Sequence, residues 1–201
     1  MTFPEQYVKQ IELADWIDKT FKIRLPTDTN RQLFSISCFD LAIEHHASIC
    51  LLLNAQLYGS AFALLRLAYE ALVRGLFLSL CATEDEINAY DKDSFGLKFN
   101  DMIIRIEGHL SIQDSGLSSL KNTSWKIFNS FTHSGIAQVI RRNKDGVTGN
   151  INYPEQELIQ VLSLAGVFAL WSVSQFAAMS ENQLLIDAVI NKNREYAAKN
   201  K

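Results

Sequence analysis

The sequence predicts an all-α protein, a single up-and-down-type helical bundle with a long central antiparallel helical hairpin. Three observations support this prediction. The 201 residues include only 3 prolines and 9 glycines, which favours long helices over a turn-rich β architecture. Hydrophobic residues make up 48% of the chain, enough for one sizeable core. Two long apolar segments, residues 31–57 and 61–81, are separated by a short turn, which is the pattern of an antiparallel helix pair.

The second of these segments, residues 61–81, carries the charges that matter most for function. Arg66, Glu70 and Arg74 recur every four residues in an otherwise apolar run, so on a helix they form one stripe. A helix that is apolar on its other faces is buried nearly all round. Because buried charges need partners, we expect this stripe to meet polar groups from other helices.

A peripheral helix is expected within residues 1–25. It starts at Pro4, since proline is favoured in the first helical turn, and runs to about Lys22. Its amphipathic pattern, which includes Val8 and Ile11, is moderate, so we expect it to pack on the outside of the bundle.

The central hairpin is expected over residues 31–81. A loop at 24–30 precedes it, its first helix runs to about Leu57, and its turn is formed by Tyr58, Gly59 and Ser60. Within one domain, 1–201, the remaining segments fall into middle helices at 83–142 and C-terminal helices at 155–198. The elements predicted there are helices at 83–93, 100–109, 117–132, 155–179 and 181–198, a helical turn at 136–142, and loops at 111–116 and 144–154. The helix at 83–93 opens with a capping box from Thr83 to Glu86.

Composition excludes several function classes. The net charge of −3 gives no general attraction to nucleic acid or acidic lipid. Charged residues lie near the N-terminus where a secretory signal needs an apolar region, so we expect a cytoplasmic protein. The cysteines Cys38, Cys50 and Cys81 form no CxxC motif, which indicates reduced core residues.

One segment raises the question of a membrane span. Residues 158–180 carry no charged side chain, and about 20 apolar residues suffice to cross a bilayer. The segment contains polar residues, among them Gln160, Ser163 and Gln175, and no basic residue flanks it closely. These features favour a buried bundle helix, and we expect no membrane contact.

The charged stripe on 61–81 has two interpretations. In the first, Asp40 and Glu44 on the neighbouring helix offset the surplus positive charge, and the resulting network holds the hairpin in register. In the second, the surplus charge of Arg66 and Arg74 faces a cleft and receives an anionic ligand or a phosphate.

A second polar cluster lies at residues 124–135, SWKIFNSFTHSG. Trp125, Asn129 and His133 share one helical stripe, with His133 at the predicted helix end. A histidine there is often a simple cap favoured by the helix dipole. Because Arg141 and Arg142 follow within two turns, this neighbourhood could also bind phosphate or perform acid–base chemistry on RNA.

Metal and cofactor motifs are not found in the sequence. His45 and His46 are adjacent and therefore point in different directions on a helix. The chain contains no E-x-x-H motif of the kind that di-metal bundles use. No Ser/His/Asp triad, Gly-rich phosphate loop or CxxC pair can be recognised. We expect no metal and no cofactor.

The segments EHHASICLLLNAQLYGSAFALLRLAYEALVRG (44–75) and SWKIFNSFTHSGIAQVIRR (124–142) resemble a bacterial family of all-helical proteins that has no established activity. The shared pattern is H-H, then L-R-x-x-x-E-x-x-x-R, then W-x-x-x-N with a following H-x-G. The resemblance spans residues 40–174 and implies a helical fold without assigning a reaction.

A weaker likeness is to the HEPN superfamily, helical bundles that include RNases of toxin and defence systems. The resemblance implies a catalytic histidine at His133 and an asparagine four residues before it, at Asn129. In those enzymes a catalytic arginine immediately precedes the asparagine, whereas this chain has Phe128.

These observations lead to one preferred function and two alternatives. We expect a non-enzymatic or degenerate HEPN-like homodimer that binds an anionic ligand or partner. Its interior polar pocket would be formed by Glu44, His45, Arg66, Glu70, Asn129 and His133. The alternatives are a metal-independent RNase of a toxin or phage-defence system, with His133 as acid or base, and a small-molecule anion receptor. In each case we expect Arg66, Glu70 and His133 to lie in one cluster.

Overall fold

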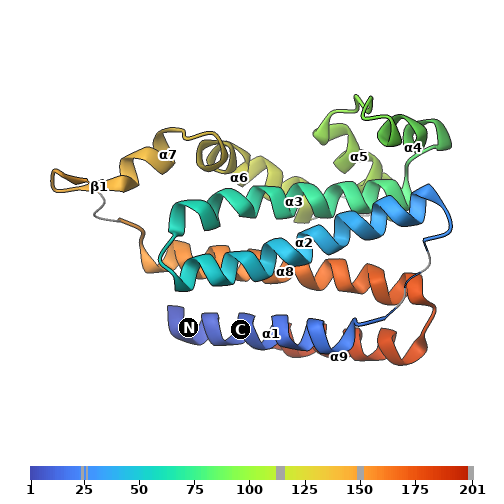
Figure 1. Ribbon diagram of the computed structural model, residues 1–201, viewed down its shortest axis with the longest axis horizontal. Helices are drawn as coiled ribbons and strands as arrows, with labels where there is room; N and C mark the ends of the chain where they lie inside the picture. Colours follow the sequence, from blue (N-terminus) through green and yellow to red (C-terminus); the bar gives the residue numbers. More distant parts are fainter. Residues whose placement is uncertain (24, 26, 112–115, 149–151, 199–201) are drawn as a thin grey trace.

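The computed structural model describes residues 1–23, 25, 27–111, 116–148 and 152–198. In these residues the chain forms nine α-helices, a 3-10 turn and a two-stranded hairpin with strands of two residues each. The predicted all-α class is therefore confirmed (Figure 1). The elements are α1 (Phe3–Thr20), α2 (Asn30–Asn54), α3 (Tyr58–Leu80), α4 (Glu84–Asp91), α5 (Phe99–Leu110), α6 (Gly116–Thr132), α7 (Ile136–Val139), η1 (Ile140–Arg142), β1 (Asn143–Lys144), β2 (Val147–Thr148), α8 (Glu155–Ser180) and α9 (Gln183–Ala198).

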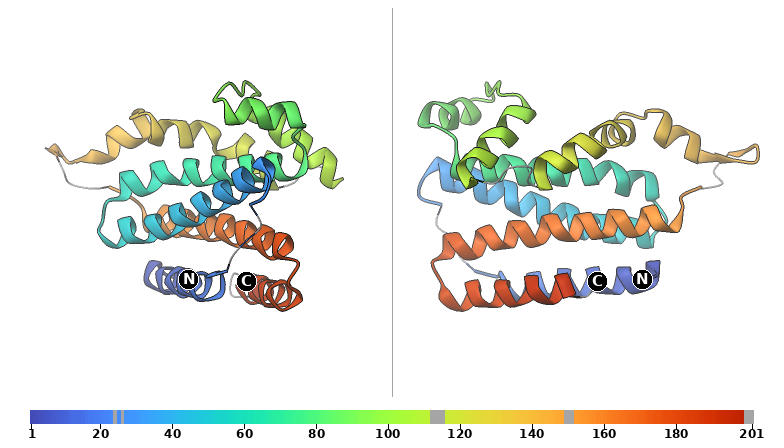
Figure 2. Two further views of the ribbon diagram at one scale, coloured as in Figure 1. Left: turned by 45° about the vertical axis from the view of Figure 1, so that its right-hand side comes forward. Right: turned by 180° about the vertical axis from the view of Figure 1, so that it is seen from behind.

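Three long helices, α2, α3 and α8, pack against one another and form the centre of the bundle. Helices α1 and α9 lie side by side against α8 on one side (Figure 2). Helices α5 and α6 pack against α3 on the opposite side, and α4 packs against the end of α2 (Figure 1). The candidate residues on α3 and α6 therefore lie on the side of the bundle away from α1.

The predicted hairpin of α2 and α3 is present, but its turn lies earlier than predicted. Helix α2 ends at Asn54 and α3 begins at Tyr58. The turn is made at Gln56, whose φ of 59° is left-handed and ends the helix. Gly59, which the sequence placed in the turn, lies in the first turn of α3. The close approach of the two helices is set at Gly75, where an added Cβ would lie 2.6 Å from the Phe39 ring.

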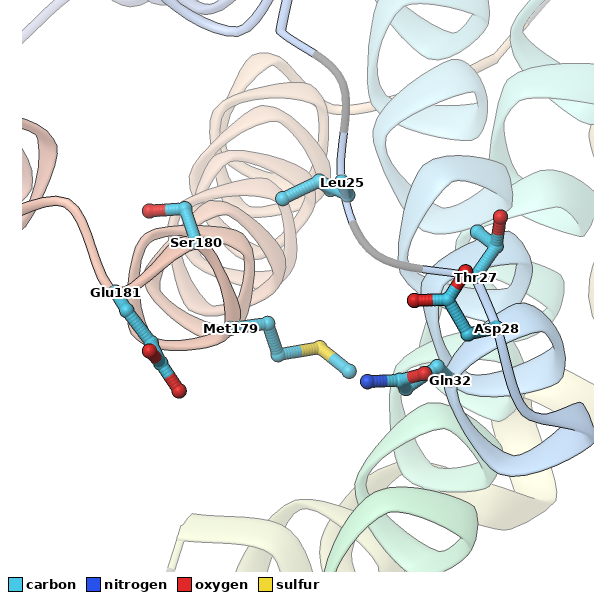
Figure 3. A pocket seen from close by; sticks show the side chains of 7 residues that line it. All are labelled: Leu25, Thr27, Asp28, Gln32, Met179, Ser180 and Glu181. Carbon is cyan, nitrogen blue, oxygen red and sulfur yellow. The ribbon is translucent and has the colours of Figure 1, made fainter.

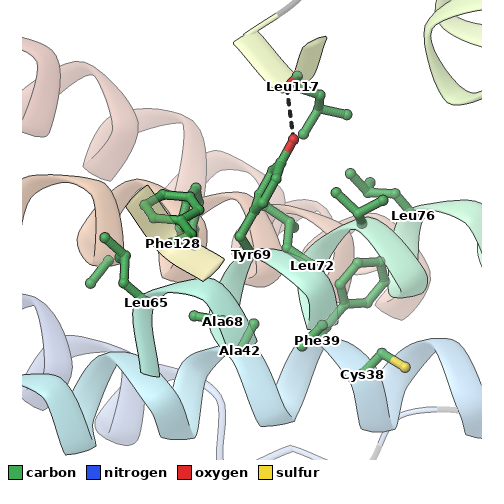
Figure 4. Close-up of a cluster of buried hydrophobic side chains, with 14 of the residues drawn as sticks. Cys38, Phe39, Ala42, Leu65, Ala68, Tyr69, Leu72, Leu76, Leu117 and Phe128 are labelled. Carbon is green, nitrogen blue, oxygen red and sulfur yellow. Dashed lines mark hydrogen bonds between the residues drawn. The ribbon is translucent and has the colours of Figure 1, made fainter. Parts of the chain in front are cut away.

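Tyr69 anchors α6 over the core. Its side chain is fully buried, and its hydroxyl donates a 2.7 Å hydrogen bond to the Leu117 carbonyl in the first turn of α6 (Figure 4). The ring also stacks on Phe168 of α8 with centroids 5.5 Å apart. This residue thus ties α3, α6 and α8 together, and it fixes where the polar stripe of α6 lies relative to α3.

The face that α1 buries is partly polar and does not include Val8 or Ile11. Val8 and Ile11 are exposed, whereas Gln6 and Gln10 are fully buried beside Leu13. The reason is that α1 meets polar side chains of α2, α8 and α9 inside the bundle, so its buried stripe is partly polar. The helix does lie at the edge of the bundle, as expected (Figure 2).

Two helices, α2 and α8, are long and apolar enough to cross a membrane by length and composition alone. In the structure α8 lies in contact with α1, α2, α3 and α9, and most of its apolar stretch is buried inside the bundle. The three predicted loops fall partly outside the described residues, at positions 24, 26, 112–115 and 149–151. The β1–β2 hairpin begins at Asn143, one residue before the third predicted loop, and the rest of it lies in the described part of that loop.

Candidate functional site

Arg66 of α3 and His133, just after the end of α6, meet across the two helices. The Arg66 Nε donates a 2.7 Å hydrogen bond to Glu70 Oε1 one turn along α3. Arg66 Nη1 lies 2.7 Å from His133 Nε2. Arg66 and Glu70 are largely buried, at 16% and 21% side-chain exposure, whereas His133 is exposed. The predicted meeting of these three side chains is present.

Trp125 supplies a flat base for this arginine. The guanidinium carbon of Arg66 lies 4.8 Å from the centre of the Trp125 ring, which is within the range of a cation–π interaction. Trp125 in turn stacks on Phe99 of α5, with centroids 4.9 Å apart and ring planes 15° apart. We refer to Arg66, Glu70, Trp125 and His133 as the Arg66 cluster.

The chemistry of arginine fixes which partner donates in the contact between Arg66 and His133. An arginine carries only donors and stays protonated, so Nε2 of His133 must accept and its proton must lie on Nδ1. Within the cluster, Glu70 pairs with the charge of Arg66. Arg66 Nη2 makes no hydrogen bond to a described residue, so part of the guanidinium is left for another acceptor.

Asn129 lies one turn before His133 on α6, and its side-chain oxygen Oδ1 is buried without a hydrogen-bond partner in the described structure. A buried acceptor without a donor carries a desolvation cost of about 1–3 kcal/mol. Trp125 and Asn129 thus lie on α6 and His133 directly follows it, as the stripe predicted, and Asn129 Oδ1 is left as a buried acceptor without a donor.

Glu44 and His45 do not join this cluster, so the predicted six-residue pocket is not assembled. Glu44 and Asp40 face α1, where both line a hollow together with Asp18. Neither carboxylate makes an ion pair with a described residue, and they do not offset the arginines of α3. His45 is half-buried on α2, and burial lowers its pKa. The sequence could not show which neighbour each stripe of α2 would face.

The two other predicted cations also lie apart from His133. Arg141 is held by Glu157 through two hydrogen bonds of 2.8 and 2.9 Å and donates a third, of 2.6 Å, to the Ala137 carbonyl. Arg74 makes no ion pair within the part of the chain that the structure describes. Its charge acts instead on Cys38 and Tyr90, near α4.

A buried polar network, which the sequence analysis did not identify, connects α1, α2, α8 and α9. The Tyr196 hydroxyl donates to the Ser163 carbonyl at 3.2 Å and accepts from Gln10 Nε2 at 2.8 Å. Gln10 Oε1 lies 3.1 Å from His46 Nε2. We call these four residues the buried network. In the sequence, the pattern that could have predicted this network is the helical spacing of Gln6 and Gln10, which places them on the same stripe as Leu13 and Ile17.

Among the described residues no three His, Cys, Asp or Glu side chains lie close enough to hold a metal ion. The three cysteines are free thiols, and burial raises the pKa of each, for Cys50 to about 12. Such thiols are poor nucleophiles at neutral pH. A separate hollow of about 550 Å³ lies between the α1–α2 connection and the α8–α9 turn, and none of the predicted site residues lines it (Figure 3).

Comparison with known proteins adds a family but no reaction. No curated protein and no solved structure matches the chain. The model of the DUF6988 family, described as a family of unknown function, matches residues 39–200. This range contains all of the Arg66 cluster and most of the helical bundle. The chain therefore belongs to the DUF6988 family, a family of unknown function.

Proposed function

We propose that the Arg66 cluster binds an anionic group of a ligand or partner without catalysing a reaction. The observation that carries this proposal is the hydrogen bond between Arg66 and the exposed His133. Trp125 and Glu70 hold the guanidinium in place, and Arg66 Nη2 remains for a phosphate or carboxylate oxygen. Planar, bidentate recognition of such groups is the task for which arginine is best suited.

The charge balance sets the expected strength of binding. Because Glu70 offsets the charge of Arg66, an incoming anion meets no net positive charge from this ion pair. Binding should therefore depend mainly on hydrogen bonds and remain weak.

RNase activity is the alternative that one observation favours. Phe128 occupies the place of the HEPN arginine and is buried in the core, but Arg66 lies beside His133 from another helix and could take over its role at a phosphate. In this arrangement Nε2 is engaged by Arg66, so acid–base work would first require that hydrogen bond to open. This requirement is the reason we prefer binding without catalysis.

Calorimetric titration with inorganic phosphate, pyrophosphate and a short single-stranded RNA tests the binding proposal. Arg66→Gln should abolish the heat of binding. Arg105→Gln is the matched control, since Arg105 is also paired with a carboxylate, Glu86, and lies over an aromatic ring, Phe77. Binding of pyrophosphate without RNA would favour a small-molecule anion receptor. Unchanged binding by Arg66→Gln, or none by the wild type, would refute the proposal.

Incubation with tRNA and mixed-sequence RNA, with and without EDTA, tests the alternative. We expect no cleavage by the wild-type protein. Cleavage that EDTA leaves unaffected and that His133→Ala abolishes in a folded protein would establish the RNase instead.

We also propose that the protein is a homodimer in the cytoplasm. Support for self-association comes from α7 and η1, which present large apolar side chains to solvent, including Ile136 and Ile140 at 75% and 61% exposure. Exposed apolar patches of this kind often mark interfaces. Light scattering should give a dimer mass for the wild type and a monomer mass for Ile136→Ser with Ile140→Ser. Leu184→Ser, at an exposed site on α9, should leave the dimer intact.

A further inference from the structure

The hollow between α1, α2 and α8, on the side of the bundle away from the Arg66 cluster, has a second set of polar groups. It measures about 330 Å³ and its wall is mainly apolar; the apolar lining residues are Ala14, Ile17, Phe21, Ile43, Ala47 and Phe176. Volumes of a few hundred Å³ with few polar groups are typical of small-molecule sites. We call it the α1–α2 hollow.

The rim of this hollow is acidic. Asp40 and Glu44, one turn apart on α2, line it and are exposed. Lys22 also lines it but pairs with Asp18 at 2.9 Å, so these two charges cancel. Two negative charges therefore remain without an ion-pair partner in the described structure. Partial burial and, to a smaller extent, the nearby Glu44 raise the pKa of Asp40.

His46 brings an unused acceptor to the same hollow. It is fully buried, lines the hollow, and its Nδ1 has no hydrogen-bond partner in the described structure. The buried network fixes the tautomer: Tyr196 donates to Ser163, Gln10 donates to Tyr196, and Gln10 Oε1 must accept from His46 Nε2–H. Nδ1 then carries a lone pair. Burial lowers the pKa of His46 to about 4, so this acceptor persists at neutral pH.

The orientation of the ring follows from the same contacts. Nε2 lies toward Gln10 and Cys50, neither of which lines the hollow. The two nitrogens of an imidazole point their proton or lone pair in widely divergent directions. The lone pair of Nδ1 is therefore turned away from the buried network.

We propose that the α1–α2 hollow binds a small primary amine with an apolar body, its ammonium group between Asp40 and Glu44, with Nδ1 of His46, which solvent does not reach, brought into contact by a side-chain shift on binding. The apolar body would lie against Phe21 and Phe176, whose ring centroids are 6.1 Å apart, and their faces can also attract a cation. An ammonium group supplies what each polar group lacks, since it carries the positive charge and the N–H donors. The site is independent of the Arg66 cluster.

Titration with 2-phenylethylamine, followed by ¹H–¹⁵N NMR, tests this proposal. Two analogues separate the contributions of charge and of hydrogen bonding to binding. Phenylacetate carries a negative in place of a positive charge, and the N-trimethyl derivative keeps the positive charge but has no N–H donor. We expect saturable shifts in the residues lining the hollow with the amine, weaker binding of the trimethyl derivative, and none of phenylacetate. Replacing both carboxylates, with Asp40→Asn and Glu44→Gln, should lower the affinity about tenfold.

The control variant is Asp101→Asn on α5, outside the hollow, which should bind the amine like the wild type. The carboxylate variants change exposed side chains, so their fold is expected to remain intact, as their own NMR spectra will show. Equal binding of the amine and phenylacetate, shifts outside the hollow, or no saturable binding would each overturn the proposal.

Discussion

Glu70 is the residue on which the charge balance of the Arg66 cluster depends, because it is the carboxylate that contacts Arg66. Glu70→Ala should lower the free energy of unfolding by about 2 kcal/mol. This is below the roughly 3–5 kcal/mol lost when one partner of a fully buried pair is removed, since both side chains retain some contact with solvent. His133→Ala should cost less than about 1 kcal/mol, because it removes one exposed hydrogen bond. Denaturant melts measure both variants.

Asp15→Ala is the control for this pair. It removes an exposed ion pair with Lys19, which should change stability by less than about 1 kcal/mol. Equal losses from Glu70→Ala and His133→Ala would show that His133 is also needed to hold α6 on α3.

Gly166 tests how tightly the buried network is packed. A Cβ at this position of α8 would collide with Gln10 Oε1 and the Tyr196 hydroxyl, so Gly166→Ala should destabilise the protein by about 1–3 kcal/mol. Gly108→Ala on α5 is the matched control. Nothing lies within 4 Å of its added Cβ, and alanine is the better helix former, so it should stabilise by about 0.5–1 kcal/mol. Melts in which both glycines behave alike would rule out this close packing.

The Arg66 cluster could be predicted in part because its signals are local. The four-residue spacing of Arg66 and Glu70 and the place of His133 at a helix end follow from helix geometry. The buried network could not be predicted, because Gln10 and Tyr196 are 186 positions apart and meet only through the tertiary fold. Glu44 was misplaced for the same reason: a stripe on a helix does not identify the neighbour it faces.

At the scale of the elements, α1 and α9 are coupled through buried polar groups as well as through the apolar cluster that both form with α8. Gln10 donates to the Tyr196 hydroxyl, and Lys9 donates to the Tyr196 carbonyl at 3.2 Å and lies over its ring.

Helix lengths were predictable to within a few residues, because apolar periodicity and capping boxes are local. The end of α2 was predicted three residues too late, because Gln56, with left-handed backbone, makes the turn in place of a glycine.

Tyr196→Phe should therefore loosen both helices at once. The change leaves the Gln10 amide without its buried acceptor, a loss of about 1–3 kcal/mol. Hydrogen exchange should become faster in α1 as well as in α9, while α3 and α6 stay protected. Tyr7→Phe, at a hydroxyl with no hydrogen bond to a described residue, is the control. Faster exchange confined to α9 would show that the two helices are not coupled.

At the scale of the whole molecule, composition and the two apolar segments predicted the up-and-down bundle. They did not predict which side of the core each outer helix covers. Helices α1 and α9, at opposite ends of the sequence, share one side, and α4 to α6 share the other (Figure 2). As a result the Arg66 cluster and the α1–α2 hollow are separated by the core helices. Ligand binding at one should leave the other unchanged.

The stability of the whole bundle should depend on pH through His46. Burial lowers its pKa to about 4 from 6.5, so between these values the unfolded chain binds a proton that the folded chain does not. Stability therefore falls as pH decreases from 6.5 to about 4, by about 3 kcal/mol in total, and this contribution is constant above 6.5.

In His46→Gln this part of the pH dependence should vanish, while His109→Gln, at an exposed histidine of α5, should keep it. Urea melts at several pH values between 4 and 7.5 measure the difference. Parallel curves for the wild type and His46→Gln would show that His46 takes up a proton equally well in the folded protein.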